Sequence, residues 1–538
     1  MRSLIISICV LSLLFHSCKN ENSKALQLGE VELAVSGSEE AIPHFERGLL
    51  LLHSFEYFDA RAAFLKAQEL DKDFGMAYWG ELMAYNHTLW QRQLTDRAKS
   101  VFRKMGPTSE TRIKLFKTEL EKDLFRSVEI LYGDGTKYER DLAYKDFMAT
   151  LVKKYPNNHE ISAFYAISLL GSARNGRDEE LYDKCAKIAQ SILEENSQHP
   201  GALHYLIHAY DDPDHAHMAS DAADFYSQVA PDATHALHMP SHIYVALGQW
   251  NDVVNSNIAS WNASIKKKLK TEGLEGSYHA LNWLQYGLLQ RNEVQLAQEL
   301  LDDMKNYSVT HPSKEARSYL IAMKGAHIVE TNDWDGPEAD FEVETNDLNI
   351  VKNGELLFLY GMTAYARKDK DRLNEIVEKL DKDLYAASLN VGDKGFAMCS
   401  TDGYASKPPN QLDIDMVSIM LSQLKAKQLM LEGNTEEAIT MLTKAAELDE
   451  TLKYAFGPPF ILKPIHEMLA EELFKLGKYD RAFEVYDTSL KRNPRRLLSL
   501  QGKQACLKEL NKTEELESLT AQLNDILSKK ERAEILKA

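Results

Sequence analysis

The strongest constraint on the fold is a spacing of small and large residues that recurs along the chain. In the stretch "FDARAAFLKA", Ala60 is followed by Phe64 four positions later and by Ala67 seven positions later. The same order of small, large and small residues recurs in "RAFEVYDTSL", where it ends at Ser489. Because an α-helix turns once every 3.6 residues, such positions form a narrow stripe that a second helix can approach closely. The pattern therefore predicts pairs of tightly packed helices.

Each stripe follows another amphipathic segment, such as "FERGLLLLHS" before the first and "HEMLAEELFKL" before the last. Together they make a helix–turn–helix unit of about 34 residues, which resembles the tetratricopeptide repeat. Residues of the family signature are matched near both ends of the chain, by Gly48, Ala60, Phe64, Ala67, Ala470, Ala482, Tyr486 and Pro494. In the middle, Cys185, Ala219 and Val253 lie 34 residues apart. The resemblance implies an all-α fold, a tetratricopeptide-type helix-turn-helix solenoid with a concave groove.

Two stretches interrupt the repeats, the acidic "NDWDGPEADFEVETND" and the Gly-, Pro- and Ser-rich "VGDKGFAMCSTDGYASKPPN", and we interpret both as long connections. The blocks "MAYWGELMAYNHTLW", "ALHMPSHIYVALGQW" and "GPPFILKPIHEMLAEELF" are similar to a group of bacterial tetratricopeptide lipoproteins. That resemblance implies an architecture and no activity. The predicted order is a lipoprotein signal peptide (1–17), a lipidated Cys with a polar tether (18–40), an N-terminal repeat array (41–330), an irregular region of helices and loops (331–424) and C-terminal repeats (425–538).

The N-terminus predicts export and lipidation. Arg2 precedes a 12-residue apolar run from Leu4 to Phe15, which is too short to span a bilayer and suits a secretory signal. The following "LFHSC" resembles the lipobox of bacterial lipoproteins, in which Cys18 would be acylated. A plain signal peptide with a chance cysteine is the alternative. No Asp follows the cysteine, so we expect a lipid anchor in the outer membrane, on a face that the sequence does not specify.

Net charge and motif content narrow the function. The formal net charge is −18 and the only basic run is "KKKLK", so we expect no nucleic acid partner. The sequence has no G-x-S-x-G, P-loop, Rossmann or His-Glu-x-x-His motif, and no nucleophile with its base can be identified. We therefore expect binding rather than catalysis, with a protein, a peptide or an extended ligand as partner. By analogy with similar lipoproteins, a TonB-dependent system for polysaccharide uptake is a candidate partner.

Histidines are concentrated between His199 and His242, where eight of the 17 lie. The stretches "HYLIH" and "HMPSH" are both His-x-x-x-His, and the second begins 34 residues after the first. Residues four apart on a helix have Cβ atoms about 5–6 Å apart, and neighbouring helices pack at roughly 8–10 Å. The imidazoles of His204, His208, His238 and His242 could therefore converge on one transition-metal ion.

Nearby residues bear on this metal hypothesis in both directions. Four polar side chains beyond the first pair could supply oxygen ligands or orient the imidazoles: Asp211, Asp212, Asp214 and His215. Pro240, in contrast, lies between His238 and His242 and either interrupts their helix or begins a new one. An interruption would free a backbone carbonyl near Ala236 that a nearby histidine could satisfy. A helix that begins at Pro240 would spoil the alignment of the two histidines.

The resemblance to tetratricopeptide repeats also implies that the first helix of each hairpin lines the groove. An aromatic and polar cluster in "YWGELMAYNHTLW" could add a stacking platform for a ligand. The candidate groove residues are His53, Trp79, Met83, Asn86, His87, His204, His208, His235, His238 and His242. Three interpretations stay open for the histidines: a metal site, a groove for a peptide or ligand, and polar packing between helices. Apart from that one metal ion, no cofactor is expected.

Overall fold

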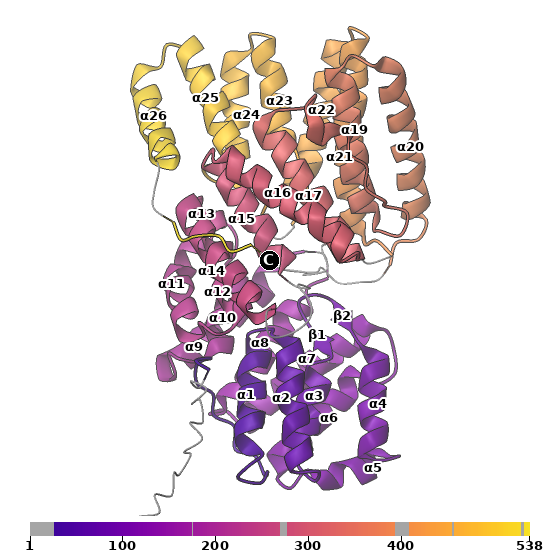
Figure 1. The fold of residues 1–538 in the computed structure, drawn as a ribbon, viewed down its shortest axis with the longest axis vertical. Helices are drawn as coiled ribbons and strands as arrows, with labels where there is room; N and C mark the ends of the chain where they lie inside the picture. Colours follow the sequence, from indigo (N-terminus) through magenta and orange to yellow (C-terminus); the bar gives the residue numbers. More distant parts are fainter. Residues whose placement is uncertain are drawn as a thin grey trace, which may run out of the picture.

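The computed structural model of the 538-residue chain describes residues 26–174, 176–268, 277–392, 408–453, 457–528 and 532–537. Within these ranges the regular structure is helical except for one antiparallel pair of two-residue strands, β1 (Asn86–His87) and β2 (Arg92–Gln93). Successive helices pack against each other and the molecule is elongated, with α1–α8 at one end, α17–α26 at the other and α9–α14 between them (Figure 1). The predicted all-α helix-turn-helix solenoid is confirmed.

The helix bounds fall into three groups along the chain. The first group is α1 (Ile42–His53), α2 (Tyr57–Leu70), α3 (Gly75–Met83), α4 (Thr95–Met105), α5 (Ser109–Arg112), η1 (Ile113–Leu115), α6 (Glu119–Leu131), α7 (Lys137–Lys154) and α8 (His159–Gly171). The second is α9 (Glu179–Glu195), α10 (Pro200–Ala209), η2 (Ala216–Ala219), α11 (Ser220–Val229), α12 (Thr234–His238), α13 (Pro240–Leu247), α14 (Trp250–Lys268), α15 (Tyr278–Gln290) and α16 (Val294–Thr310). The third is α17 (Lys314–Thr331), α18 (Pro337–Asp340), α19 (Ile350–Ala366), α20 (Lys370–Ser388), α21 (Gln411–Leu431), α22 (Thr435–Thr451), α23 (Ile465–Lys475), α24 (Tyr479–Arg492), α25 (Leu497–Glu509) and α26 (Thr513–Leu527).

The small and large residues of the repeat stripe explain how the hairpins close. Phe64 on α2 is fully buried and its ring lies against two glycines, Gly48 on α1 and Gly80 on α3. A Cβ atom added at Gly48 would lie 2.6 Å from the Phe64 ring, closer than real Cβ atoms approach any neighbour. Tyr486 on α24 fits against Gly502 on α25 in the same way. The stripe therefore sets the distance between helices through the fit of a ring against a missing side chain.

The region predicted as irregular, 331–424, holds more regular structure than its sequence pattern indicates. The long helices α19 and α20 lie within it, and α21 begins in it. The acidic stretch is a connection, as expected, and its carboxylates pair with arginines: Asp340 with Arg367 at 2.7 Å, and Asp347 with Arg317 at 2.8 Å. Helix α19 carries the same stripe in Gly354, Phe358 and Gly361, and its two glycines pack against Val417 and Leu424 of α21. The sequence interpretation overlooked this stripe.

Part of the predicted tether packs on the fold. Leu28 is buried, the Glu30 N–H donates to the Gln198 carbonyl at 2.9 Å, and the Ser36 N–H donates to a Glu121 carboxylate oxygen at 2.6 Å. Residues 26–40 therefore lie along the N-terminal helices instead of forming a free linker. The predicted signal peptide and Cys18 lie outside the described residues. Within the described part of the chain, no helix has both the length and the apolar composition that crossing a membrane requires.

Candidate metal centre

The histidines predicted from the sequence come from three short helices that meet in the middle of the molecule. Helix α10 carries His204 and His208, α12 carries His235 and His238, and α13 carries His242. The break between α12 and α13 falls at Met239, which keeps helical dihedrals of φ −53° and ψ −36°. Pro240 is the first residue of α13, a position where its missing N–H costs no intrahelical bond.

The predicted misalignment at Pro240 therefore does not occur. His238 and His242 stay side by side, with their Nε2 atoms 3.3 Å apart. However, the four predicted ligands do not surround one point. His204 and His208 gather with His235, whereas His238 and His242 gather with His279 on α15. The four residues therefore divide between two three-histidine groups, and a further group of His208, Asp211 and His242 connects them.

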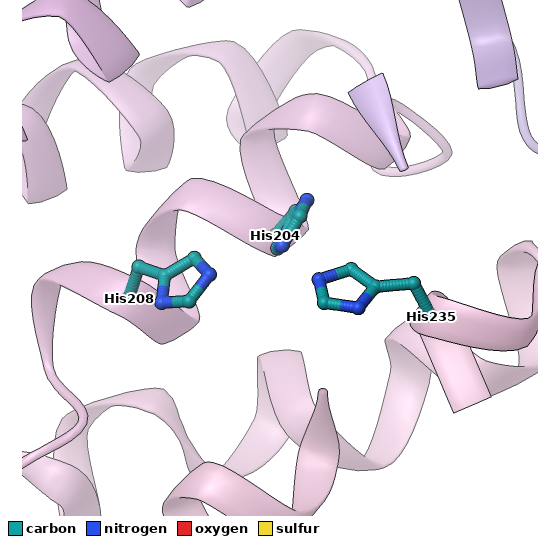
Figure 2. A group of neighbouring side chains, drawn as sticks. All are labelled: His204, His208 and His235. Atoms are coloured by element: carbon teal, nitrogen blue, oxygen red, sulfur yellow. The ribbon is translucent and has the colours of Figure 1, made fainter. Parts of the chain in front are cut away.

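We call the first group, His204, His208 and His235, the first centre. The three imidazoles point toward one another from α10 and α12 (Figure 2), and their potential ligand atoms all lie within 4.8 Å of one another. Among the described residues, none of the three Nε2 atoms has a hydrogen-bond partner, although all three are buried. Three buried and unsatisfied nitrogens at one place are rare in a folded protein and point to a ligand.

Hydrogen bonds on the opposite side of each ring fix the proton positions on α10. His204 Nδ1 lies 2.7 Å from the His53 carbonyl oxygen, and His208 Nδ1 lies 3.4 Å from Asp211 Oδ2. A carbonyl and an ionised carboxylate can only accept, so each Nδ1 carries the proton and each Nε2 exposes a lone pair. Metal-binding histidines are commonly held in this way, by an acceptor on the ring nitrogen that does not bind the metal.

The charge states at the first centre also suit a metal. Burial, followed by the neighbouring His208, holds the pKa of His204 well below its ordinary value. Burial, followed by the neighbouring His204, also holds the pKa of His235 well below its ordinary value. Burial acts to raise the pKa of Asp211, but its hydrogen bonds with His208 and His242 outweigh burial and lower that pKa to about 2. His204 and His235 are therefore neutral near pH 7, and Asp211 is ionised.

The backbone of His235 is held by the carboxylate of Glu56, 179 residues away in the sequence. Glu56, just before α2, accepts a hydrogen bond from the backbone N–H of His235 at 3.0 Å and another from the Thr234 hydroxyl. Its other oxygen pairs with Lys267 on α14 at 2.6 Å. A negative charge at a helix N-terminus satisfies free N–H groups and favours the helix dipole. Glu56 therefore fixes the start of α12 and with it the position of the His235 ring.

A third cluster, formed by His53, His199 and Glu160, places a carboxylate between two imidazoles. His53 Nε2 lies 2.7 Å from Glu160 Oε2, and His199 Nε2 lies 3.2 Å from Glu160 Oε1. His199 Nδ1 accepts the Ala202 N–H, and the Tyr205 hydroxyl lies 2.9 Å from His53 Nδ1. His53 therefore donates through Nε2 to Glu160 Oε2. His199 Nε2 and Glu160 Oε1 lie at ion-pair distance without hydrogen-bond geometry, and neither atom has a hydrogen-bond partner among the described residues. We interpret this cluster as a structural hydrogen-bond network.

The predicted groove residues are enclosed. His53 and Trp79 are fully buried, and Met83, Asn86 and His87 are buried as well. Helix α3 ends at Met83, so the aromatic and polar cluster does not share one helix face. His204, His208, His238 and His242 are also buried, and only His235 is partly exposed. In this structure, these side chains line an interior and present no open groove to a bulky partner.

The aromatic cluster splits into a core part and a part beside the first centre. His87 on β1 stacks on Tyr57 with ring centroids 4.0 Å apart. Trp90 meets both His87 and His235 edge-on, at 5.1 and 6.3 Å between ring centroids. Phe55 stacks on the His235 ring at 5.6 Å. The first centre therefore has an aromatic wall on the side of α2 and the β1–β2 turn.

Sequence reasoning missed His279, His199 and Glu160 as members of these clusters. His279 follows His238 by 41 residues, so the 34-residue period does not reach it. Glu160 lies on α8, and no local pattern relates it to His53 or His199. Asp211, which the sequence suggested as an orienting residue, lies within hydrogen-bonding distance of His208 and His242.

Part of the C-terminal region matches a known repeat family in sequence. The sequence model of the tetratricopeptide repeat family matches residues 464–496, so the chain contains a tetratricopeptide repeat formed by α23 and α24. No curated protein matches the chain in sequence. The human IFIT1 dimer with m7Gppp-AAAA is 11% identical, with 93% of this chain and 92% of that chain covered and a TM-score of 0.34. Yeast Tom70 is 13% identical, with 90% and 99% covered and a TM-score of 0.28. These TM-scores are low, and the packed helical hairpins of the chain itself establish its fold.

Proposed function

We propose that this chain is a helical-repeat protein that binds a transition-metal ion through His204, His208 and His235. The observation that carries the proposal is the set of three buried Nε2 atoms that face one another without a hydrogen-bond partner among the described residues. Each such atom costs about 1–3 kcal/mol when it is buried and unsatisfied. One ion bound by all three nitrogens would remove the three penalties together.

The ligand chemistry favours a zinc-like or copper-like ion over calcium or magnesium. Neutral imidazole nitrogens suit zinc, copper, iron and nickel, whereas calcium and magnesium take oxygen ligands. Three histidines also leave a fourth coordination position for water or another ligand in a tetrahedral site. His235 is the only partly exposed ligand of the three, so that position would be reached from its side of the centre.

The direct test is metal binding by protein purified without a histidine tag, stripped with a chelator and titrated with Co²⁺ or Zn²⁺. We expect the double variant His204→Ala/His208→Ala to lose one equivalent that the wild type binds. His217→Ala is the matched control because His217 lies in the same segment but is exposed. Equal metal content in the wild type and the double variant, with helicity retained in both, would overturn the proposal.

We also propose that the C-terminal helices serve as a scaffold for a protein partner. The support is the tetratricopeptide repeat at 464–496, a module that generally mediates protein–protein interaction, together with a surface depression between α21 and α22. Ser422, Thr440, Met441 and Lys444 are among the residues that line the depression. Lys444→Glu should reduce partner capture from a membrane extract without loss of helicity. Unchanged capture would argue against this surface.

The proposed cellular location is the outer membrane, through a lipid on Cys18. The support is the apolar run that precedes "LFHSC" and the polar residues that follow it. Labelling with a clickable fatty acid should mark the wild type and spare Cys18→Ala, which should also leave the membrane fraction. A Cys18→Ala protein that stays fully membrane-bound would refute the anchor. The link to TonB-dependent polysaccharide uptake stays a prediction by analogy.

A further inference from the structure

The second histidine group, His238, His242 and His279, has fixed proton positions on two of its rings. His238 Nδ1 lies 2.6 Å from Asn257 Oδ1. The Asn257 amide nitrogen donates to the Val253 carbonyl at 2.8 Å, so it is the amide oxygen that faces His238. His238 Nδ1 therefore donates, and its Nε2 carries a lone pair.

His242 is fixed in the same way by a carboxylate. His242 Nδ1 lies 3.3 Å from Asp211 Oδ2, which can only accept while Asp211 is ionised. Its Nε2 therefore also carries a lone pair, and this atom lies 3.3 Å from His238 Nε2. Both rings are buried. Two lone pairs face each other at close range, an arrangement that is repulsive unless a proton or a cation lies between them.

A metal cation fits the distance between the two Nε2 atoms. A tetrahedral site with bonds of about 2.1 Å places neighbouring nitrogens about 3.4 Å apart, close to the 3.3 Å between His238 Nε2 and His242 Nε2. A shared proton would satisfy only these two nitrogens, whereas a metal ion can also bind the third imidazole of the group, His279.

His279 completes a ring of aromatic groups around this space. Its ring centroid lies 4.6 Å from that of His238, and the potential ligand atoms of all three histidines lie within 4.8 Å of one another. Trp283, one turn along α15, covers His242 with ring centroids 4.5 Å apart. The three imidazoles of the group are therefore enclosed by the fold.

We infer that the protein holds a second transition-metal ion between His238, His242 and His279, and that Asp211 links it to the ion at the first centre. Asp211 Oδ2 accepts from His208 of the first centre at 3.4 Å and from His242 of the second at 3.3 Å. The second site stands on its own contacts, and only the linkage rests on the proposed function. The third cluster is the internal contrast, because there both Nε2 atoms face a carboxylate.

The two ions should exchange at different rates. All three histidines of the second group are buried, whereas His235 of the first centre is partly exposed. A chelator should therefore remove the first ion quickly and the second slowly. The two centres also share one carboxylate, so loading both ions places more positive charge beside Asp211 than one ion does. Co²⁺ should bind in two resolved steps.

The test is a Co²⁺ titration of the stripped, untagged protein, followed by its visible absorption spectrum. We expect two equivalents in the wild type and one in each of the double variants His204→Ala/His208→Ala and His238→Ala/His242→Ala. Asp211→Asn should weaken both steps by about 10–100-fold. His217→Ala should bind as the wild type does.

The outcomes separate the second ion from the proposed function. One equivalent in the wild type that both double variants abolish would leave a single centre and overturn the second ion. Two equivalents that survive His238→Ala/His242→Ala would also overturn it. No binding at all would overturn both proposals. If that double variant misfolds, His279→Gln is the milder substitute, and it should remove the slow phase of chelation while leaving the fast phase.

Discussion

Histidine serves two purposes within a few ångströms in this molecule, and the hydrogen-bond partner of each nitrogen decides which. His53 donates through Nε2 to Glu160, and His199 Nε2 lies 3.2 Å from the other oxygen of that carboxylate, so both rings pair with one buried charge. His204 and His208 donate through Nδ1 and turn their Nε2 lone pairs inward. The residue type is the same, and the difference is which ring nitrogen faces the acceptor: Nε2 beside Glu160, and Nδ1 in His204 and His208.

Glu160→Gln should destabilise the fold without changing metal binding. Burial acts to raise the pKa of Glu160, but His53 and His199 outweigh it and hold that pKa well below its usual range. The amide would place an N–H against one imidazole donor and lose the buried charge, at a cost of about 2–4 kcal/mol. Urea unfolding measures the cost. Glu195→Gln is the control, since its pair with His159 is at the surface and should matter by less than about 1 kcal/mol. Loss of Co²⁺ binding in Glu160→Gln would contradict the structural role of this cluster.

Glu56→Gln should weaken the first centre and spare the second. The neutral amide accepts a weaker hydrogen bond from the backbone N–H of His235, so the start of α12 is held less firmly. We therefore expect about a tenfold loss in affinity for one Co²⁺ step. Asp59→Asn is the matched control, because Asp59 also pairs with Lys267 but the structure shows no contact from it to α12 within the described residues. If both variants lose the same Co²⁺ affinity, the loss comes from the disturbed Lys267 and not from the start of α12.

At the scale of helices, the spacing of the stripe fixes how closely neighbours approach. Phe64 lies between Gly48 and Gly80, so three helices meet around one ring. The same device recurs with Tyr486 and Gly502 near the other end of the chain. Each hairpin therefore positions the next one, and the accumulated placement brings α10, α12, α13 and α15 together around the histidines.

Gly80→Ala should destabilise the protein by about 1–3 kcal/mol, because the new methyl group would overlap the Phe64 ring in a packed core. The direction of this change in unfolding free energy is informative, because Gly→Ala inside a helix otherwise stabilises a protein by roughly 0.5–1 kcal/mol. Urea unfolding measures the change. Ala62→Ser on the exposed face of α2 is the control and should change stability by no more than about 0.5 kcal/mol. A stabilised Gly80→Ala protein would show that the ring can move aside.

At the scale of the whole molecule, a buried arginine connects the C-terminal repeat to the middle of the chain. Arg496 is fully buried and its guanidinium contacts Glu467 on α23 at 2.8 Å, Glu330 on α17 at 2.5 Å and the Tyr286 hydroxyl on α15 at 3.0 Å. The C-terminal segment adds a second connection, because the Trp261 indole donates to the Leu536 carbonyl at 2.8 Å. These contacts hold the tetratricopeptide repeat against the half that carries the histidines.

Arg496→Met should cost about 3–5 kcal/mol near pH 7, because it removes the buried cation that Glu467 and Glu330 share. Burial acts to raise the pKa of Glu467, but Arg496 and then Lys463 outweigh it and hold that pKa well below its usual range. Ionised Glu467 therefore adds stability above its unfolded-state pKa of about 4.3, and that stability is lost as the pH falls below it. The gap in unfolding free energy between wild type and variant should narrow from pH 7 to pH 3.

Arg495→Met is the matched control for this prediction. Arg495 is the neighbouring residue, and its guanidinium pairs with Asp525 at the surface at 2.6 Å. Its loss should cost less than about 1 kcal/mol at either pH. If the difference in unfolding free energy between the wild type and Arg496→Met stays constant between pH 7 and pH 3, Glu467 does not account for the pH dependence.

The sequence by itself determined the helical hairpins, because a stripe such as Ala60, Phe64 and Ala67 is a local pattern that helix geometry turns directly into a packing face. It also determined that His204 and His208 share one face, and that Pro240 could begin a helix. Only the tertiary structure decided the rest: that His235 and His279 join the clusters, and that Glu160 closes a different one. The reason is that a site of this kind depends on the direction of a lone pair. That direction is set by acceptors such as the His53 carbonyl, 151 residues away in the sequence.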